Sequence, residues 1–120
     1  MAKILVVDDS ETIRSMVAVE LSKAGYEVRT AADGKEALDD IGQHLPELIV
    51  LDVEMPEMDG YSLLRNIRKD DSPAKNVPVL MLTSKGKYGD MFFMEGANDF
   101  IEKSPEAIQD LVGKVESLMK

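Results

Sequence analysis

Two apolar stretches of this 120-residue sequence end on carboxylates. The run LIVL at 48–51 leads directly into Asp52, and the run KILVV at 3–7 leads into Asp8 and Asp9. If the three acids meet in the fold, their charges repel, and some must take up a proton unless a cation is present. A hard divalent cation such as Mg²⁺, or Mn²⁺ in its place, binds carboxylate and phosphate oxygens together. The three acids therefore predict a divalent-metal site.

A hydroxyl and an ammonium follow the two later apolar stretches. Thr83, with Ser84 beside it, follows the run 77–82, and Lys103 follows the short stretch 99–101. The lysine offers a positive point charge and the threonine a hydroxyl donor to an anion beside the metal. Together with the acids, these are the groups that stabilise a phosphoryl group during its transfer. An aspartate in such a site can itself be the nucleophile and form an acyl phosphate.

Each of these residues also has an ordinary structural explanation. Asp8 and Asp9 could simply precede a helix N-terminus, where acidic side chains are favoured. Asp52 could cap a turn, Thr83 could end a strand, and Lys103 could be a solvated surface residue. The phosphate-site interpretation is favoured because the groups follow successive predicted strands rather than standing alone.

The elements that must position these groups alternate between strand and helix, as in a parallel sheet covered by helices. The predicted strands are 3–7, 26–31, 48–51, 77–82 and 99–101. Helices are predicted between an N-cap at Ser10 and a C-cap at Gly25, from a turn at Asp33-Gly34 to about Gly42, over 61–68, and from Pro105 onward. Ligands bind at the carboxyl ends of the strands in such sheets, which is where the candidate groups fall.

The composition narrows the classes of function. The net charge of −9 opposes contact with nucleic acid or an anionic membrane surface. The chain has no cysteine, which excludes disulfides and thiolate catalysis and is consistent with a reducing cytoplasm. The one histidine, His44, is interpreted as a solvated helix-end residue. With no signal-peptide pattern and no membrane-length apolar run, one cytoplasmic domain over 1–120 is expected.

At these residues the sequence resembles the receiver domain of bacterial two-component response regulators. The resemblance spans the whole chain, from ILVVDDS through LDVEMPEMDG to GANDFIEK. It implies a flavodoxin-like, doubly wound five-stranded parallel sheet in the order 2-1-3-4-5. It also implies that Asp52 accepts a phosphoryl group from the phosphohistidine of a histidine kinase or phosphotransfer protein. The domain would catalyse this Mg²⁺-dependent step on itself and would not be a conventional enzyme.

The resemblance also implies a set of metal ligands. Asp9 and Asp52 would bind the ion together with the backbone carbonyl of Glu54, and Asp8 would help through a water molecule. No other cofactor is implied.

Further roles follow from the same resemblance. Thr83 and Lys103 would contact the phosphoryl oxygens, and Phe100 would be an aromatic switch that turns inward when Thr83 moves towards the phosphate. Phe100 also has a simpler explanation as a core aromatic on a short strand. Glu54 and Lys85 stand two positions beyond Asp52 and Thr83, and we expect them to form an ion pair that tunes dephosphorylation.

The sequence departs from the family pattern in two places. The interval between Thr83 and Gly96 is short, which predicts a fourth helix that is short, distorted or absent. Family members commonly carry a proline, joined by a cis bond, directly after the lysine, whereas here Ser104 stands between Lys103 and Pro105. A cis bond before a non-proline residue costs about 3 kcal/mol, so we expect a trans bond or a shifted local geometry.

The predicted function is that of a stand-alone, monomeric phosphoacceptor that switches its contacts with an unidentified target protein. Chemotaxis or motility is the expected pathway, because no DNA-binding domain follows in this sequence. Alternatives are a receiver fragment of a larger regulator or, less favoured, an aspartyl-phosphate phosphatase, which needs a second aspartate where Glu54 stands. A flavodoxin is disfavoured because Asp8 and Asp9 would repel the flavin phosphate.

Overall fold

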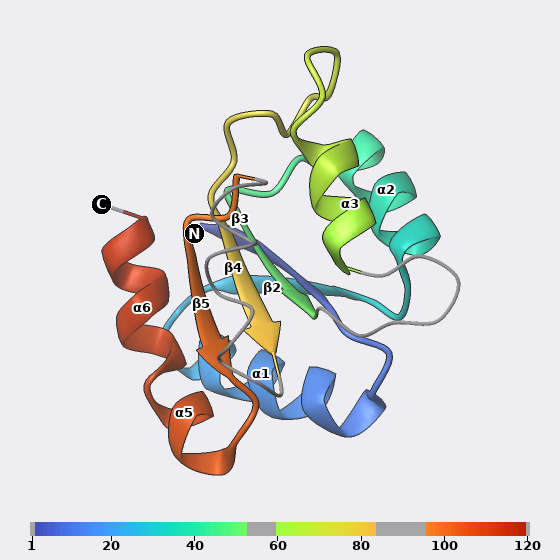
Figure 1. The fold of residues 1–120 in the computed structure, drawn as a ribbon. Helices are drawn as coiled ribbons and strands as arrows, with labels where there is room; N and C mark the ends of the chain where they lie inside the picture. The colour runs from blue at the N-terminus through green and yellow to red at the C-terminus, as the bar shows by residue number, and fades with distance from the viewer. Residues whose placement is uncertain (1, 53–59, 84–95, 120) are drawn as a thin grey trace.

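The computed structural model describes residues 2–52, 60–83 and 96–119 (Figure 1). Its centre is one parallel sheet with the strand order β2-β1-β3-β4-β5. The strands are β1 (Lys3–Val7), β2 (Glu27–Ala31), β3 (Leu48–Asp52), β4 (Val79–Thr83) and β5 (Asp99–Glu102). The predicted flavodoxin-like sheet is confirmed.

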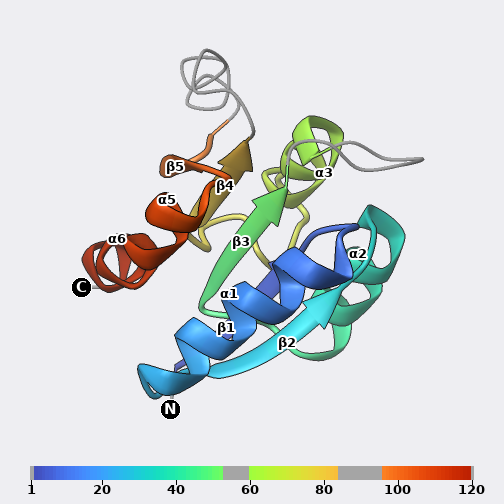
Figure 2. The ribbon, with the colours of Figure 1, turned by 90° about the horizontal axis from the view of Figure 1, so that it is seen from below.

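Helices cover both faces of the sheet (Figures 1 and 2). They are α1 (Glu11–Lys23), α2 (Gly34–Gln43), α3 (Gly60–Ile67), α5 (Pro105–Gln109) and α6 (Leu111–Leu118). In the described parts of the chain, no helix has the length and apolarity needed to cross a membrane.

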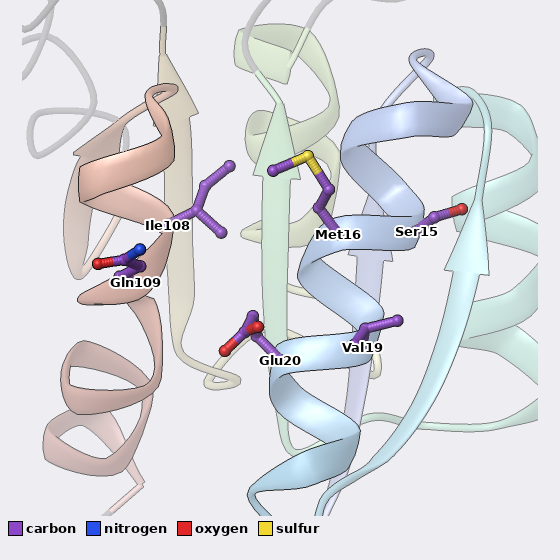
Figure 3. A pocket seen from close by; sticks show the side chains of 6 residues that line it. All are labelled: Ser15, Met16, Val19, Glu20, Ile108 and Gln109. Carbon is purple, nitrogen blue, oxygen red and sulfur yellow. The ribbon is translucent and has the colours of Figure 1, made fainter.

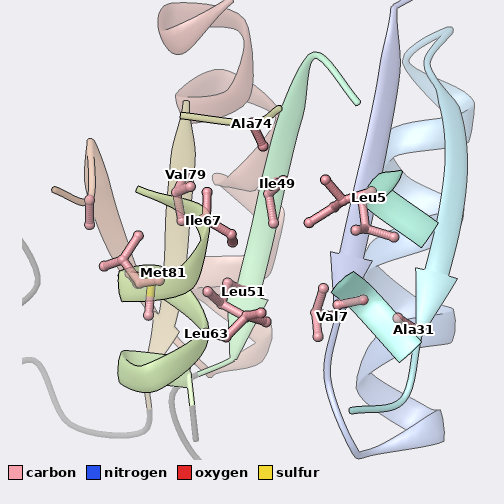
Figure 4. Close-up of a cluster of buried hydrophobic side chains, with 14 residues drawn as sticks. Leu5, Val7, Ala31, Ile49, Leu51, Leu63, Ile67, Ala74, Val79 and Met81 are labelled. Carbon is pink, nitrogen blue, oxygen red and sulfur yellow. The ribbon is translucent and has the colours of Figure 1, made fainter. Parts of the chain in front are cut away.

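Alternate residues of each strand pack into two separate hydrophobic clusters, one on each face of the sheet. Leu5, Ile49 and Met81 belong to the cluster under α2 and α3 (Figure 4). The intervening residues, such as Val6 and Val50, face α1, α5 and α6 in the second cluster. Because both faces are covered, the central strands β3 and β4 are apolar on both faces up to their last residues, Asp52 and Thr83, as expected of a parallel sheet.

Three helices begin at residues whose side chains cap the first turn. The side chains of Ser10, Asp33 and Ser104 accept hydrogen bonds from backbone N–H groups three residues later, at 3.3, 2.8 and 3.1 Å. Such caps satisfy donors that the first turn leaves open. The predicted turn at Asp33-Gly34 is therefore wrong in part, because Gly34 is already the first residue of α2.

Several other boundaries differ from the prediction, most of them by one residue. The C-cap of α1 is Ala24, and Gly25 follows it with a φ of 97°, which glycine adopts readily. Strand β4 begins at Val79 rather than at 77, since the N–H of Val77 bonds back to Ala74 and Pro78 has no N–H to give. The last helix is broken at Asp110 into α5 and α6. The predicted irregularity of a fourth helix falls on 84–95, outside the described residues.

Arg68, which follows α3, forms hydrogen bonds to the segments that precede β4 and β5. Its guanidinium donates to the carbonyls of Gly96 and Lys75 and to Asn98 Oδ1, at 2.9 to 3.0 Å. Burial lowers the pKa of Arg68. Gly96 has a φ of 100°, and a Cβ placed there would lie 3.1 Å from the Arg68 side chain, so the close approach requires glycine.

Candidate functional site

The carboxyl ends of four neighbouring strands meet at one edge of the sheet. Asp8 follows β1, Asp52 is the last residue of β3, and Thr83 is the last residue of β4. In register, Asp52 lies opposite Leu82, one residue before Thr83. Lys103 follows β5, and its backbone N–H donates to the carbonyl of Thr83 at 2.8 Å. The predicted convergence of these groups is confirmed.

Three carboxylates form the centre of this edge. Asp8, Asp9 and Asp52 each offer an oxygen that lies within 4.8 Å of the others. Asp8 and Asp52 have no exposed surface, whereas Asp9 is exposed. Two acids are thus held in the interior and the third stands at the solvent side of the cluster.

Lys103 provides the opposing charge. Its Nζ atom lies 2.6 Å from Asp52 Oδ1 and 3.1 Å from Asp8 Oδ2. Burial of the ammonium by itself lowers the pKa of Lys103, but the hydrogen bond to Asp52 and the charges of Asp52 and Asp8 outweigh it, so the pKa is raised. The ammonium is therefore held in its charged form between the two buried acids.

The turn after β1 is held by bonds to the backbone and side chain of Asp8. The N–H of Asp8 donates to the carbonyl of Ala31 at 3.1 Å, and Asp8 Oδ1 accepts a hydrogen bond from the N–H of Ser10 at 2.9 Å. The carbonyl of Asp8 accepts a 2.7 Å hydrogen bond from Nη1 of Arg14. Sequence reasoning did not find Arg14. The signal available was a basic residue near a helix N-terminus, where the dipole disfavours positive charge.

The donor set fits a hard divalent cation. Three carboxylates face one ammonium, so the cluster carries two uncompensated negative charges if all are ionised. Among the described residues, the only partner of Asp8 Oδ2 is the Lys103 ammonium, at 3.1 Å. Oxygen ligands with excess negative charge are those that Mg²⁺ and Mn²⁺ prefer. Asp8, Asp9 and Asp52 could hold such an ion; Glu54 lies outside the described residues.

Thr83 and Phe100 lie on the same face of the sheet. Phe100 pairs in register with Met81, and Met81 and Thr83 are alternate residues of β4. Thr83 is buried, and Phe100 is half-buried against the cluster under α2 and α3. This position is compatible with either a core residue or a switch. The predicted partner of Glu54, Lys85, is also outside the described residues, as is Ser84.

The junction after Lys103 has a trans geometry. None of the described peptide bonds is cis, so the expectation of a trans Lys103–Ser104 bond is confirmed. The N–H of Ser104 donates to the carbonyl of Glu102 at 3.0 Å, and its hydroxyl caps α5. A proline in place of Ser104 would make neither bond.

His44 is exposed at the C-cap of α2, as predicted.

An apolar groove runs between α1 and α5, beside the site edge (Figure 3). It has a volume of about 380 Å³ and is lined by Ser15, Met16, Val19, Glu20, Ile108 and Gln109. Met16 and Val19 are 38% and 50% exposed, which is unusual for large apolar side chains among the described residues. Both helices begin just after residues of the acidic site, so the groove opens close to it.

Comparison with known proteins gives consistent matches. A model of the response regulator receiver domain matches residues 4–116. The probable transcriptional regulator ycf27 of Cyanophora paradoxa is 42% identical over 120 residues, covering 98% of this chain and 48% of the relative. The chain spans about half the length of the curated relatives it matches.

Solved structures agree in fold. The Vibrio cholerae chemotaxis protein CheY4 is 38% identical, with a TM-score of 0.89 and 98% of each chain covered. The response regulator TrrA of Thermotoga maritima, solved in complex with Mg²⁺-BeF, is 35% identical, with a TM-score of 0.87, and covers 98% of this chain and 99% of its own.

Proposed function

Because this chain belongs to the response regulator receiver domain family, we propose that Asp52 accepts a phosphoryl group from a phosphohistidine. A carboxylate oxygen of Asp52 attacks phosphorus, the P–N bond breaks, and the imidazole nitrogen leaves with the bonding electron pair. The product is an acyl phosphate on Asp52. The domain makes this change once on itself and does not turn over a substrate. The observation that carries the proposal is the Lys103 ammonium held against both Asp52 and Asp8 in a cluster of three acids.

The surrounding residues have separate roles in this proposal. Asp8, Asp9 and Asp52, with the backbone carbonyl of Glu54, would bind Mg²⁺ or Mn²⁺, which when bound offsets negative charge on the acids and the phosphoryl oxygens. Lys103 would move part of its contact from Asp52 to a phosphoryl oxygen. Support for the metal comes from the acid cluster and from the related TrrA, whose structure contains Mg²⁺-BeF.

The proposed phosphodonor is a histidine kinase or a phosphotransfer protein. The apolar groove between α1 and α5 opens beside the acids, so a donor seated there would bring its phosphohistidine to Asp52. A protein donor would pack against the apolar side chains of this groove, whereas a small phosphate compound would need only the acidic site. The groove would therefore affect transfer from a protein donor alone.

The output is proposed to be a change in protein–protein contacts, with the receiver itself a cytoplasmic monomer. The names of the relatives suggest two output pathways for the receiver. The relative ycf27 is described as a probable transcriptional regulator, and CheY4 as a chemotaxis protein. The predicted absence of a nucleic-acid role is therefore not supported for the whole protein. We infer only that the acidic receiver does not itself contact DNA. Transcriptional control by a longer chain is the first candidate output, and chemotaxis is the second.

Intact-mass measurement after incubation with acetyl phosphate and Mg²⁺ tests the proposal. The wild type should gain one phosphate, and neither Asp52→Asn nor a sample treated with chelator should gain it. Asp99→Asn is a matched control, because Asp99 also pairs with a lysine, Lys114, at 3.0 Å but lies outside the acid cluster; it should gain the phosphate normally. An adduct that persists in folded Asp52→Asn, or its absence in the wild type, would overturn the assignment.

A further inference from the structure

Arg14 joins α1 to the turn that carries two of the acids. Its Nη1 atom donates a 2.7 Å hydrogen bond to the carbonyl of Asp8, and its backbone N–H donates to the carbonyl of Ser10 at 2.9 Å. The side chain is half-buried. A positive charge near a helix N-terminus is opposed by the helix dipole. The hydrogen bond to Asp8 therefore stabilises an arginine at a place that is otherwise unfavourable for it.

The carbonyl that Arg14 binds determines where Asp9 lies. The C=O of Asp8 and the N–H of Asp9 belong to one planar peptide unit, so fixing the carbonyl also fixes the start of the Asp9 backbone. The other bonds of the turn hold Asp8 itself, through Ala31 and Ser10. In the part of the chain described, no hydrogen bond or ion pair holds the exposed Asp9 carboxylate. Its position depends on its backbone.

We propose that Arg14 is a positioning residue for the divalent-metal site. It holds the Asp8–Asp9 peptide so that the Asp9 carboxylate faces Asp8 and Asp52 before an ion arrives. This inference rests on the proposed function, because it requires a metal at the acid cluster. Two effects of Arg14 oppose each other: its charge repels a cation, whereas its hydrogen bond orients a ligand. Loss of a group that orients a metal ligand typically weakens binding by tenfold or more.

The sign of the affinity change separates these two effects. Arg14→Met keeps a long side chain but removes both the charge and the donor, and we expect it to weaken Mn²⁺ binding about tenfold. Arg14→Lys keeps the charge and one donor group, and should bind with intermediate affinity. Arg29→Met is the matched control, since Arg29 is 47% exposed and pairs with Asp40 at 2.7 Å, away from the acids. Removing that charge should leave binding unchanged or slightly tighter.

The experiment measures free Mn²⁺ by electron paramagnetic resonance during titration of each folded variant. Amide hydrogen exchange of Ser10, whose N–H donates to Asp8 Oδ1 at 2.9 Å in the same turn, is the second readout. Weaker binding and faster Ser10 exchange in Arg14→Met support positioning. Equal or tighter binding in Arg14→Met contradicts it while leaving the proposed function intact. If Arg14→Met does not fold, wild-type affinity in Arg14→Lys contradicts positioning. Absence of Mn²⁺ binding by the wild type overturns the metal site itself, and with it this inference.

Discussion

The ammonium nitrogen of Lys103 lies 2.6 Å from Asp52 Oδ1, although the two residues are 51 positions apart in the chain. The contact links the ends of β3 and β5 across the intervening strand β4. Because the same nitrogen is 3.1 Å from Asp8, one positive charge offsets the repulsion between two buried acids. A divalent ion would take over part of this role, so we expect lysine and metal to compete for the same carboxylates.

Lys103→Met tests that competition. Without metal, we expect the variant to lose about 2 kcal/mol of unfolding free energy, less than for a fully buried pair because the lysine side chain is 18% exposed. Mn²⁺ should bind more tightly than to the wild type, while phosphorylation by acetyl phosphate should slow. Lys114→Met, which removes an ion pair at 3.0 Å outside the cluster, should leave Mn²⁺ affinity unchanged. Weaker metal binding in Lys103→Met would contradict competition.

The pH dependence of stability should reveal the same contact. The pKa of Lys103 is raised above its usual value of 10.5, so its pairing contributes fully below that pH and is lost as the pH rises through the folded-state pKa. Urea unfolding of the wild type and Lys103→Met from pH 7 to pH 11.5 gives the difference. It should be constant near neutrality and shrink above about pH 10.5. A difference that grows with pH would reverse the assigned direction of the shift. Comparing two proteins with the same Tyr26 cancels its raised pKa.

Thr83→Val tests whether the hydroxyl couples the phosphate to Phe100. We expect the variant to fold with a loss of about 1 kcal/mol, because the buried hydroxyl is replaced by a methyl group. It should still bind beryllofluoride with Mg²⁺, as a stand-in for the phosphoryl group. The NMR signals of the Phe100 ring should shift on binding in the wild type and much less in Thr83→Val. Equal shifts in both proteins would show that the Thr83 hydroxyl does not couple the phosphate to Phe100, and the absence of a shift in the wild type would identify Phe100 as a core residue only.

The groove between α1 and α5 should matter for a protein donor and not for a small one. We expect the double variant Met16→Gln, Val19→Ser to accept phosphate from acetyl phosphate at the wild-type rate. Transfer from a cognate phosphohistidine protein should slow about tenfold, through lost apolar burial. Leu45→Ser is the matched control, since Leu45 is as exposed as Val19, at 50%, but lies outside the groove. Equal transfer rates in the double variant and this control would remove the groove from donor binding.

Ser104→Ala tests the junction that replaces the family's usual proline. Loss of the hydroxyl that caps α5 should cost about 1 kcal/mol in urea unfolding. Asp33→Ala removes the corresponding cap of α2 and should cost a similar amount. Only Ser104→Ala should also slow phosphorylation by acetyl phosphate, because Ser104 follows the site lysine directly. The same slowing in both variants would mean a general effect of lost stability.

The sequence predicted the sheet and the members of the acid site well, because both depend on local patterns. Apolar runs located the strands to within a few residues, and the groups that follow them had to meet at one sheet edge. The break at Asp110 was not predictable, because the apolar positions of α5 and α6 continue one helical pattern across it. The contact between Arg14 and the Asp8 carbonyl was also not predictable, because the acceptor is a backbone atom that no residue type reveals.

The strand order also has a consequence for synthesis on the ribosome. Asp8 and Asp52 leave the exit tunnel well before Lys103, which arrives only with the last strand of the sheet. A nascent chain without β5 would bring two acids together with no lysine between them, so early compaction of β1 against β3 is opposed by their charge. Bringing residues 8 and 103 together closes a long loop, which is slow. We therefore expect the pairing of Lys103 with the two acids to be a late event in the folding of the site.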